Sequence, residues 1–257
     1  MSGSITLENR FGVNKMELIS LKYAIFVIVL LVLYYCFPKK YRWYVLLAGS
    51  MAYYVIICKW YVLFIIFTIC TTYGSTIWID KLLKEQNAIV KSHKEDWDRQ
   101  TRKEYKEKGR KKRVAVMLFA LLCNFGILAF LKYIPYAGEL GLLLPLGISF
   151  YTFQSMGYVM DVYREIVEPE KNFLKVALFV SFFPQIIQGP IAIYDKLAGQ
   201  LYEGHSLRLE NLQKGALLVL WGVMKKLVIA DRAVNIINFV MDKPMDFSGT
   251  YVFFAAV

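Results

Sequence analysis

Long apolar runs separated by short charged segments constrain this chain more than any other feature. A helix needs about 20 apolar residues to cross the hydrocarbon core of a bilayer. Four runs in the first half reach or approach that length, at residues 18–37, 43–58, 61–79 and 114–131. Only 20% of the residues are charged, and they are bunched between the runs, whereas about a quarter are charged in soluble domains. The sequence therefore predicts an all-α membrane protein.

The positive charge follows the order of these runs. A net charge of +11 would suit a nucleic-acid binder, but the basic residues lie between apolar runs, where the positive-inside rule accounts for them. Residues 80–113 hold 13 Lys and Arg against 7 Asp and Glu. We place this segment in the cytoplasm, which puts the N-terminus outside. The expected location is a plasma or inner membrane crossed several times, with the lipid bilayer and no nucleic acid as partner.

Composition divides the chain into four parts. They are a polar N-terminal segment at 1–15, three transmembrane helices within 16–79, a basic cytoplasmic loop at 80–113 and a core segment at 114–257. The interleaved charges of the basic loop suit a solvated helix at the membrane surface.

Broken or re-entrant helices are expected in the C-terminal half. Pro184 and the pair Gly189-Pro190 interrupt one apolar run, because proline removes a backbone donor and Gly-Pro favours a turn. Another run, at 217–224, is too short to cross a membrane before two lysines follow. Residues 247–257 resemble the beginning of a further membrane helix, so we expect a fragment that is truncated at its C-terminus.

The few residues that could ligate a metal form no recognisable site. Each cysteine lies inside an apolar run and none belongs to a CxxC pair, so buried thiols are expected at Cys36, Cys58, Cys70 and Cys123. The two histidines, His93 and His205, lack the spacing of zinc ligands. We predict no metal and no bound cofactor.

Residues 144–164, LPLGISFYTFQSMGYVMDVYR, are apolar enough for a membrane yet carry several polar groups. Helical spacing gathers one set on a single face, namely Gly147, Tyr151, Gln154, Tyr158 and Asp161. The opposite face carries Phe153, Met156, Met160 and Tyr163, with the small Ser149. Two interpretations stay open, because such a face either bonds to neighbouring helices or lines a substrate pathway. Arg164 follows Asp161 by three residues near the inner boundary and is close enough to pair with it.

Two further stretches have the same mixed character. In residues 179–197, Gln185 and Gln188 lie in the break around Pro184. They either cap the freed backbone groups of a kinked helix or form a wall of a buried polar site. In residues 221–232, Lys225 and Arg232 fall seven apart on one helical face. That segment is either an amphipathic helix at the membrane boundary or a place where Lys225 or Lys226 holds an anionic donor.

Together the three stretches resemble the membrane-bound O-acyltransferase (MBOAT) family. The matching motifs are PLGISFYTFQ at 145–154, FFPQIIQGPI at 182–191 and GVMKKLVIAD at 222–231. Their order and spacing are similar to the bacterial branch that contains the alginate O-acetylation and teichoic-acid D-alanylation membrane proteins. The resemblance covers most of residues 20–257. It implies a ring of membrane helices around a thinned centre, with a funnel on the outer side.

The resemblance also implies a reaction. An acyl group, with acetyl favoured, passes from acetyl-CoA or an acyl carrier to a hydroxyl of an exported polysaccharide or cell-wall polymer. A separate extracytoplasmic acyltransferase is an implied partner. The candidate chamber-lining residues are Tyr151, Gln154, Tyr158, Asp161, Arg164, Gln185 and Gln188. The candidate basic residues on the donor side are Lys225 and Lys226.

The implied catalytic histidine is missing from these 257 residues. The family's general base lies in a WRRWH-like segment, which would follow Val257, and neither His93 nor His205 occupies a matching motif. We therefore assign no catalytic residue and predict that the chain alone is inactive. The purified chain, with no other subunit present, is expected to transfer no radiolabelled acetyl group from acetyl-CoA to polysaccharide, and measurable transfer would contradict this.

Two other functional classes remain as alternatives. A polytopic transporter or channel would use the face from Gln154 to Asp161 as its path, although no internal repeat supports a transporter built from inverted halves. A non-catalytic remnant would keep only an assembly or regulatory role. An in-frame continuation with a Trp-His pair in a basic segment would favour the acyltransferase, and an authentic stop codon would favour the remnant.

Overall fold

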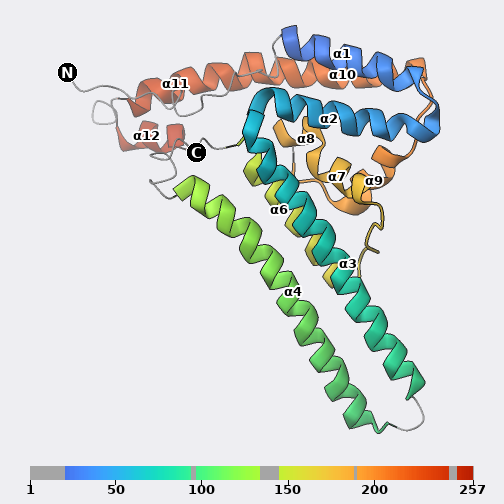
Figure 1. Ribbon diagram of the computed structural model, residues 1–257. Coiled ribbons are helices and arrows are strands. Elements are labelled where there is room, and N and C mark those ends of the chain that lie inside the picture. The colour runs from blue at the N-terminus through green and yellow to red at the C-terminus, as the bar shows by residue number, and fades with distance from the viewer. Residues whose placement is uncertain (1–20, 94–96, 134–144, 188–189, 243–247, 257) are drawn as a thin grey trace. The chain divides into compact units, whose positions relative to one another are not determined.

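The computed structural model describes residues 21–93, 97–133, 145–187, 190–242 and 248–256. Within these ranges every regular element is a helix, as Figure 1 shows, which confirms the predicted all-α class. The chain divides into two compact units, residues 1–204 and residues 205–257. The first unit holds helices α1 to α9 and the second holds α10 to α12.

Helices α1 (Leu21–Cys36) and α2 (Arg42–Cys58) form an antiparallel pair in the first unit. A 3₁₀ turn at Lys39–Tyr41 joins them, and Arg42 closes the turn by donating from Nε to the carbonyl oxygen of Phe37 at 2.9 Å. The two helices approach closely at Gly49, where a Cβ atom would lie 2.4 Å from Cδ1 of Leu30. This pair therefore forms one side of the apolar core.

Helix α3 (Val62–Ser92) leaves α2 through a bend at Lys59, whose φ is +47°. Two helical stretches are long and apolar enough to cross a membrane, Lys39–Ser92 and Arg99–Tyr133. The first contains both α2 and α3, so the predicted boundary between the runs at 43–58 and 61–79 coincides with the bend. Two shorter apolar helices, Leu21–Cys36 and Phe173–Ile186, accompany them.

The basic segment at 80–113 is not a separate loop or helix. Its described residues continue α3 as far as Ser92 and begin α4 (Arg99–Tyr133), so the two long helices form a hairpin with a charged end (Figure 1). At a rise of 1.5 Å per residue α3 is about 45 Å long, well beyond the roughly 30 Å of a bilayer core. The extension stays helical because no proline interrupts it and pairs such as Lys81 with Glu85 support it at the i, i+4 spacing.

Helix α6 (Ile148–Tyr163) packs against α3, α4 and α7 (Phe173–Ser181). The predicted break around Pro184 is confirmed, since α7 ends at Ser181 and the short α8 (Phe183–Ile187) follows. Phe182 separates the two helices with ψ of 105°. Pro184 lies in the first turn of α8, where its missing N–H is tolerated. The amphipathic α9 (Tyr194–Tyr202) completes the first unit.

The second unit contains one uninterrupted helical stretch instead of the predicted short run. Helix α10 (Leu209–Met224) continues through a π-helical segment, Lys225–Ala230, into α11 (Asp231–Met241). The apolar run at 217–224 therefore lies inside a longer helix, which begins eight residues earlier, but this helix is not among the described stretches that are long and apolar enough to cross a membrane. Helix α12 (Gly249–Ala256) follows.

Candidate functional site

The site begins at a tight turn in front of α6. Gly147 precedes the helix with φ of +69°, a left-handed conformation that glycine adopts without strain. A Cβ atom at this position would lie 2.5 Å from the carbonyl oxygen of Ile186 in α8. Gly147 belongs to the first motif and Ile186 to the second, so the structure brings these two motifs into direct contact.

Gln154 joins α6 to the end of α7. Its side chain is 2% exposed, and Nε2 donates to the carbonyl oxygen of Phe179 at 2.8 Å. In a continuous helix that carbonyl would accept from the N–H of Phe183, but the break at Phe182 turns this N–H toward Oγ of Ser50, at 3.3 Å. Gln154 and Ser50 thus satisfy two of the backbone groups that the break frees, the carbonyl of Phe179 and the N–H of Phe183.

Tyr158 links the same helix to the segment before α7. Its hydroxyl accepts from the backbone N–H of Glu170 at 2.8 Å, and its ring stacks on Tyr194 with centroids 4.1 Å apart. The Tyr194 hydroxyl lies 3.5 Å from that of Tyr202, which donates to the carbonyl oxygen of Lys175 at 2.9 Å. A chain of tyrosines therefore runs from the buried face of α6 to the surface of α9.

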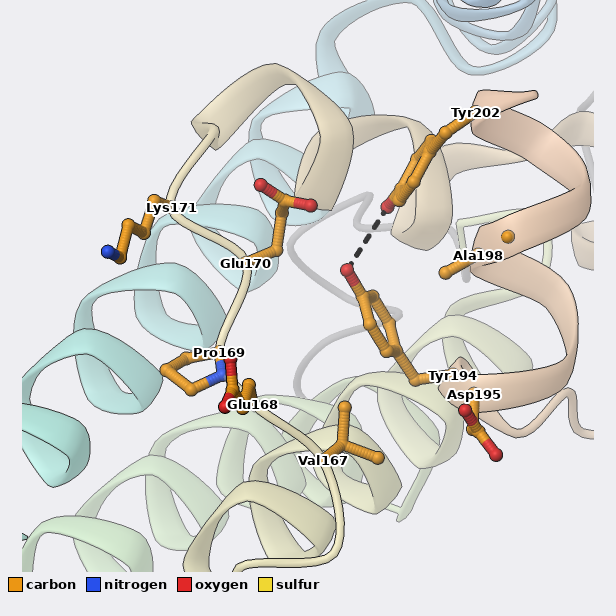
Figure 2. Close-up of a pocket in the computed structure, with 10 residues that line it drawn as sticks. Val167, Glu168, Pro169, Glu170, Lys171, Tyr194, Asp195, Ala198 and Tyr202 are labelled. Atoms are coloured by element: carbon orange, nitrogen blue, oxygen red, sulfur yellow. Dashed lines mark hydrogen bonds between the residues drawn. The ribbon is translucent and has the colours of Figure 1, made fainter. Parts of the chain in front are cut away.

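A cavity of about 490 Å³ opens at the outer end of this tyrosine chain. The segment 167–171 forms one wall and α9 forms the other, and Figure 2 shows Tyr194 and Tyr202 pointing toward each other between them. Glu170 is held in place by Lys175 at 3.6 Å and by the N–H of Asn172 at 3.0 Å. The cavity therefore presents phenolic and carboxylate groups, which suit a ligand that donates hydrogen bonds.

Burial raises the pKa of Tyr194 and of Tyr202 above the ordinary value of 10.0, and for Tyr202 the neighbouring Tyr194 adds to the rise. Removing water disfavours the phenolate more than the neutral phenol. Both hydroxyls therefore stay protonated at neutral pH and act as hydrogen-bond donors or acceptors. Neither is suited to the role of general base.

The raised pKa of Tyr202 predicts a loss of stability at alkaline pH. Above about pH 10 the tyrosine ionises in the unfolded chain but stays protonated in the folded chain. The stability that this tyrosine contributes is therefore complete below that pH and declines as the pH rises. A Tyr202→Phe variant is expected to unfold at a lower temperature at pH 8 but to lose less with further alkalinisation. Thermal unfolding followed by circular dichroism across pH 8–11 measures both effects, and a slope as steep as that of wild type would contradict the assignment.

The buried face of α6 matches the predicted stripe in part. Tyr151, Gln154 and Tyr158 are buried, and Phe153 and Met160 point outward, as helical spacing indicates. Three residues differ from the prediction. Gly147 precedes the helix instead of lying on its face. Met156, predicted on the opposite face, is fully buried, because α6 packs against several helices. Asp161 is half-buried.

Three buried hydroxyls beside this face keep unused hydrogen-bonding capacity. The hydroxyls of Tyr54 and Tyr151 lie close to one another and to the Cys58 thiol, without hydrogen-bond geometry. The two rings meet edge to face at 6.3 Å, and Oγ of Ser155 is also buried with no partner among the described residues.

The remaining predicted residues lie elsewhere. Among the described residues Asp161 and Arg164 form no ion pair, and the adjacent Glu165 instead binds Arg113 at 2.8 Å. Gln185 donates to the carbonyl oxygen of Pro190, which supports a capping role. Gln188 lies outside the described residues. His93 follows the last residue of α3 and stacks on Trp97, with centroids 4.9 Å apart.

Lys225 and Lys226 belong to the second unit. Lys225 is exposed and its Nζ lies 5.3 Å above the ring of Trp221. The predicted common face of Lys225 and Arg232 assumed a regular α-helix. The π-helical segment between them adds a residue to the turn, so a spacing of seven no longer returns to the same face.

Sequence reasoning missed Ser50, Glu170, Tyr194 and Tyr202. Ser50 is a lone polar residue in an apolar run, and such a residue has no specific signal. The tyrosines of α9 lie eight residues apart, close to two helical turns. That spacing places them on one face and was the available signal.

Comparison with known proteins shows which enzymes this sequence resembles. The chain is 31% identical over 170 residues to the peptidoglycan O-acetyltransferase of Helicobacter pylori, a match that covers 51% of this chain and 32% of that protein. It is 40% identical over 89 residues to the probable alginate O-acetylase AlgI of Pseudomonas syringae pv. tomato, covering 35% of this chain and 17% of that protein. The AlgI of Pseudomonas aeruginosa is 38% identical over 90 residues, with the same two coverages.

The matched regions span a third or less of the length of each of these relatives. No known family profile matches the chain, and no solved structure matches it. The resemblance to bacterial membrane-bound O-acyltransferases, which the three motifs predict, is confirmed by these relatives.

Proposed function

We propose that this chain is part of a membrane O-acetyltransferase that modifies an exported polysaccharide or a cell-wall polymer. The observation that carries the proposal is its similarity to enzymes named for peptidoglycan and for alginate O-acetylation. Both acceptors are glycans with free hydroxyl groups. The acyl donor would be a thioester, either acetyl-CoA or an acetylated carrier.

In this reaction the acceptor oxygen attacks the carbonyl carbon of the thioester. A carbon–oxygen bond forms and the carbon–sulfur bond breaks, and the hydroxyl proton passes to a base and then to the leaving thiolate. The resemblance implies a histidine for that base. The proposal assigns Gln154 and Ser50 to the wall of the site, because they hold the broken helix in place. The buried hydroxyls of Tyr54, Tyr151 and Ser155 have no hydrogen-bond partner among the described residues and are assigned to the same wall.

The membrane arrangement belongs to the same proposal. The chain would cross an inner or plasma membrane several times, with the charged end of the α3–α4 hairpin in the cytoplasm and the N-terminus outside. Two helical stretches of sufficient length and the basic composition of residues 80–113 support it. A helical ring around a thinned centre, and an extracytoplasmic acyltransferase as partner, follow from the resemblance.

Deletion of the encoding gene tests the proposal directly. The source organism without the gene is expected to lose most ester-linked acetate from one envelope or exported polysaccharide, measured after mild alkaline release. The amide-linked acetyl groups of the same polymer are the internal control and should not change. Unaltered ester content in every surface glycan would contradict the proposed function.

The transporter alternative finds less support in the geometry. A transport pathway needs polar groups that face water or substrate. Gln154 and Tyr158 instead form hydrogen bonds with backbone groups of the protein itself. The face of α6 therefore serves first to hold the broken helix.

A further inference from the structure

A stripe of basic residues on α4 faces the neighbouring helix α3. Lys103, Lys106, Arg110 and Arg113 follow one another at spacings of three and four, which places them on one helical face. All four line a cavity of about 340 Å³, together with Glu107 of the same helix, Leu83, Gln86 and Asn87 of α3, and Glu165 beyond α6. This cavity shares no residue with the tyrosine-lined one, although Glu165 of the first and Val167 of the second are only two residues apart.

The charges around the cavity are not balanced. Arg113 is 8% exposed and is compensated by Glu165, at 2.8 Å. Among the described residues, Lys103, Lys106 and Arg110 form no ion pair. Like charges at spacings of three and four repel one another. The cavity therefore has four cations against two carboxylates, and an anion bound there would relieve the repulsion.

The cavity walls are held together before any ligand arrives. Nε2 of Gln86 donates to the carbonyl oxygen of Lys106 at 3.0 Å and ties α3 to α4. Glycine at position 109 leaves room for this side chain, since a Cβ atom there would lie 2.4 Å from Oε1 of Gln86 and would displace its amide group. Nε of Arg113 is buried with no hydrogen-bond partner among the described residues. The site is therefore formed before any ligand binds, with a buried arginine in its wall and side-chain donors that are free to bind a ligand.

We propose that this cavity binds a phosphate ester. A phosphate offers oxygens that accept from both arginine and lysine, and arginine suits it geometrically. Basic pockets between membrane helices on the cytoplasmic side commonly take phosphorylated lipid headgroups, and the apolar part of α4 begins directly after Arg113. The ester is either such a headgroup or a soluble phosphate ester. The inference stands independently of the proposed acetyl transfer.

Matched double variants test the site. Lys106→Gln with Arg110→Gln removes two cavity cations, whereas Lys111→Gln with Lys112→Gln removes the same charge from exposed positions of the same helix that do not line the cavity. The full chain is reconstituted in phosphatidylcholine nanodiscs that contain phosphatidylglycerol. The protein is then extracted into detergent, and the lipid molecules that it retains are counted by native mass spectrometry. Binding of glycerol 3-phosphate to each variant is measured separately by calorimetry.

The cavity variant is expected to weaken binding about fivefold for each cation removed, and the control variant to stay within about twofold of wild type. If the cavity variant retains less phosphatidylglycerol than the wild-type chain, the ligand is a lipid headgroup. If the cavity variant loses only the binding of glycerol 3-phosphate, the ligand is a soluble phosphate ester. Equal losses in the two double variants would indicate a general effect of basic charge and overturn the proposal, as would no loss with either probe. Both double variants alter exposed side chains and should keep the wild-type unfolding temperature.

Discussion

A Gly147→Ala variant unfolds at a much lower temperature than the wild-type chain. The left-handed conformation at φ of +69° costs a residue with a Cβ atom about 1–2 kcal/mol. The new methyl group would also lie 2.5 Å from the carbonyl oxygen of Ile186, and such overpacking costs a further 1–3 kcal/mol, roughly. Because the obstacle is backbone, α8 itself has to move. The expected loss of several kcal/mol is measured by thermal unfolding in detergent.

Gly157→Ala is the matched control for this change. Gly157 lies within α6, and no atom would come within 4 Å of a Cβ atom placed there. The variant is expected to be neutral, or more stable by up to about 1 kcal/mol, because alanine favours the helix over glycine. An equal loss in the two variants would mean that α6 tolerates no added methyl group anywhere. The specific role of the turn at Gly147 would then be refuted.

Apolar run length and proline were enough to predict much of the fold. The bend between α2 and α3 coincides with Lys59, where two apolar runs meet, and the break between α7 and α8 coincides with the segment before Pro184. Periodicity also predicted the burial of Tyr151, Gln154 and Tyr158. These features depend on hydropathy and on backbone chemistry, which act locally along the chain.

The features that could not be predicted depend on distant partners. The bond between Ser50 and Phe183 joins residues 133 positions apart, and that between Arg113 and Glu165 joins residues 52 apart. Nothing in the local sequence of Ser50 distinguishes it from a serine that bonds within its own helix. Met156 was misplaced for a related reason, since helical periodicity identifies one buried face but not the number of helices that surround it. The π-helical segment has no compositional signal of its own.

A Gln154→Met variant is expected to lose about 1–3 kcal/mol of stability, because the buried carbonyl of Phe179 is then left without a donor. Methionine keeps the length of the side chain, so the cavity term stays small. Gln185→Met is the matched control. Its bond to the Pro190 carbonyl is exposed, so water replaces the lost donor and the expected loss is below about 0.5 kcal/mol.

Combining Gln154→Met with Ser50→Ala tests whether the contributions of the two side chains to stability are coupled. Ser50 and Gln154 each satisfy one backbone group that the same break frees, so removing either lets the junction of α7 and α8 relax and weakens the contribution of the other. The double variant is therefore expected to be less destabilised than additivity predicts, with an interaction energy of roughly 0.5–1.5 kcal/mol. Strict additivity in the unfolding measurements would mean that the two bonds support separate elements. If the proposed function is right, ester-linked acetate should decline in step with the stability of this junction, because the broken helix carries the wall on which the acyl group would be placed.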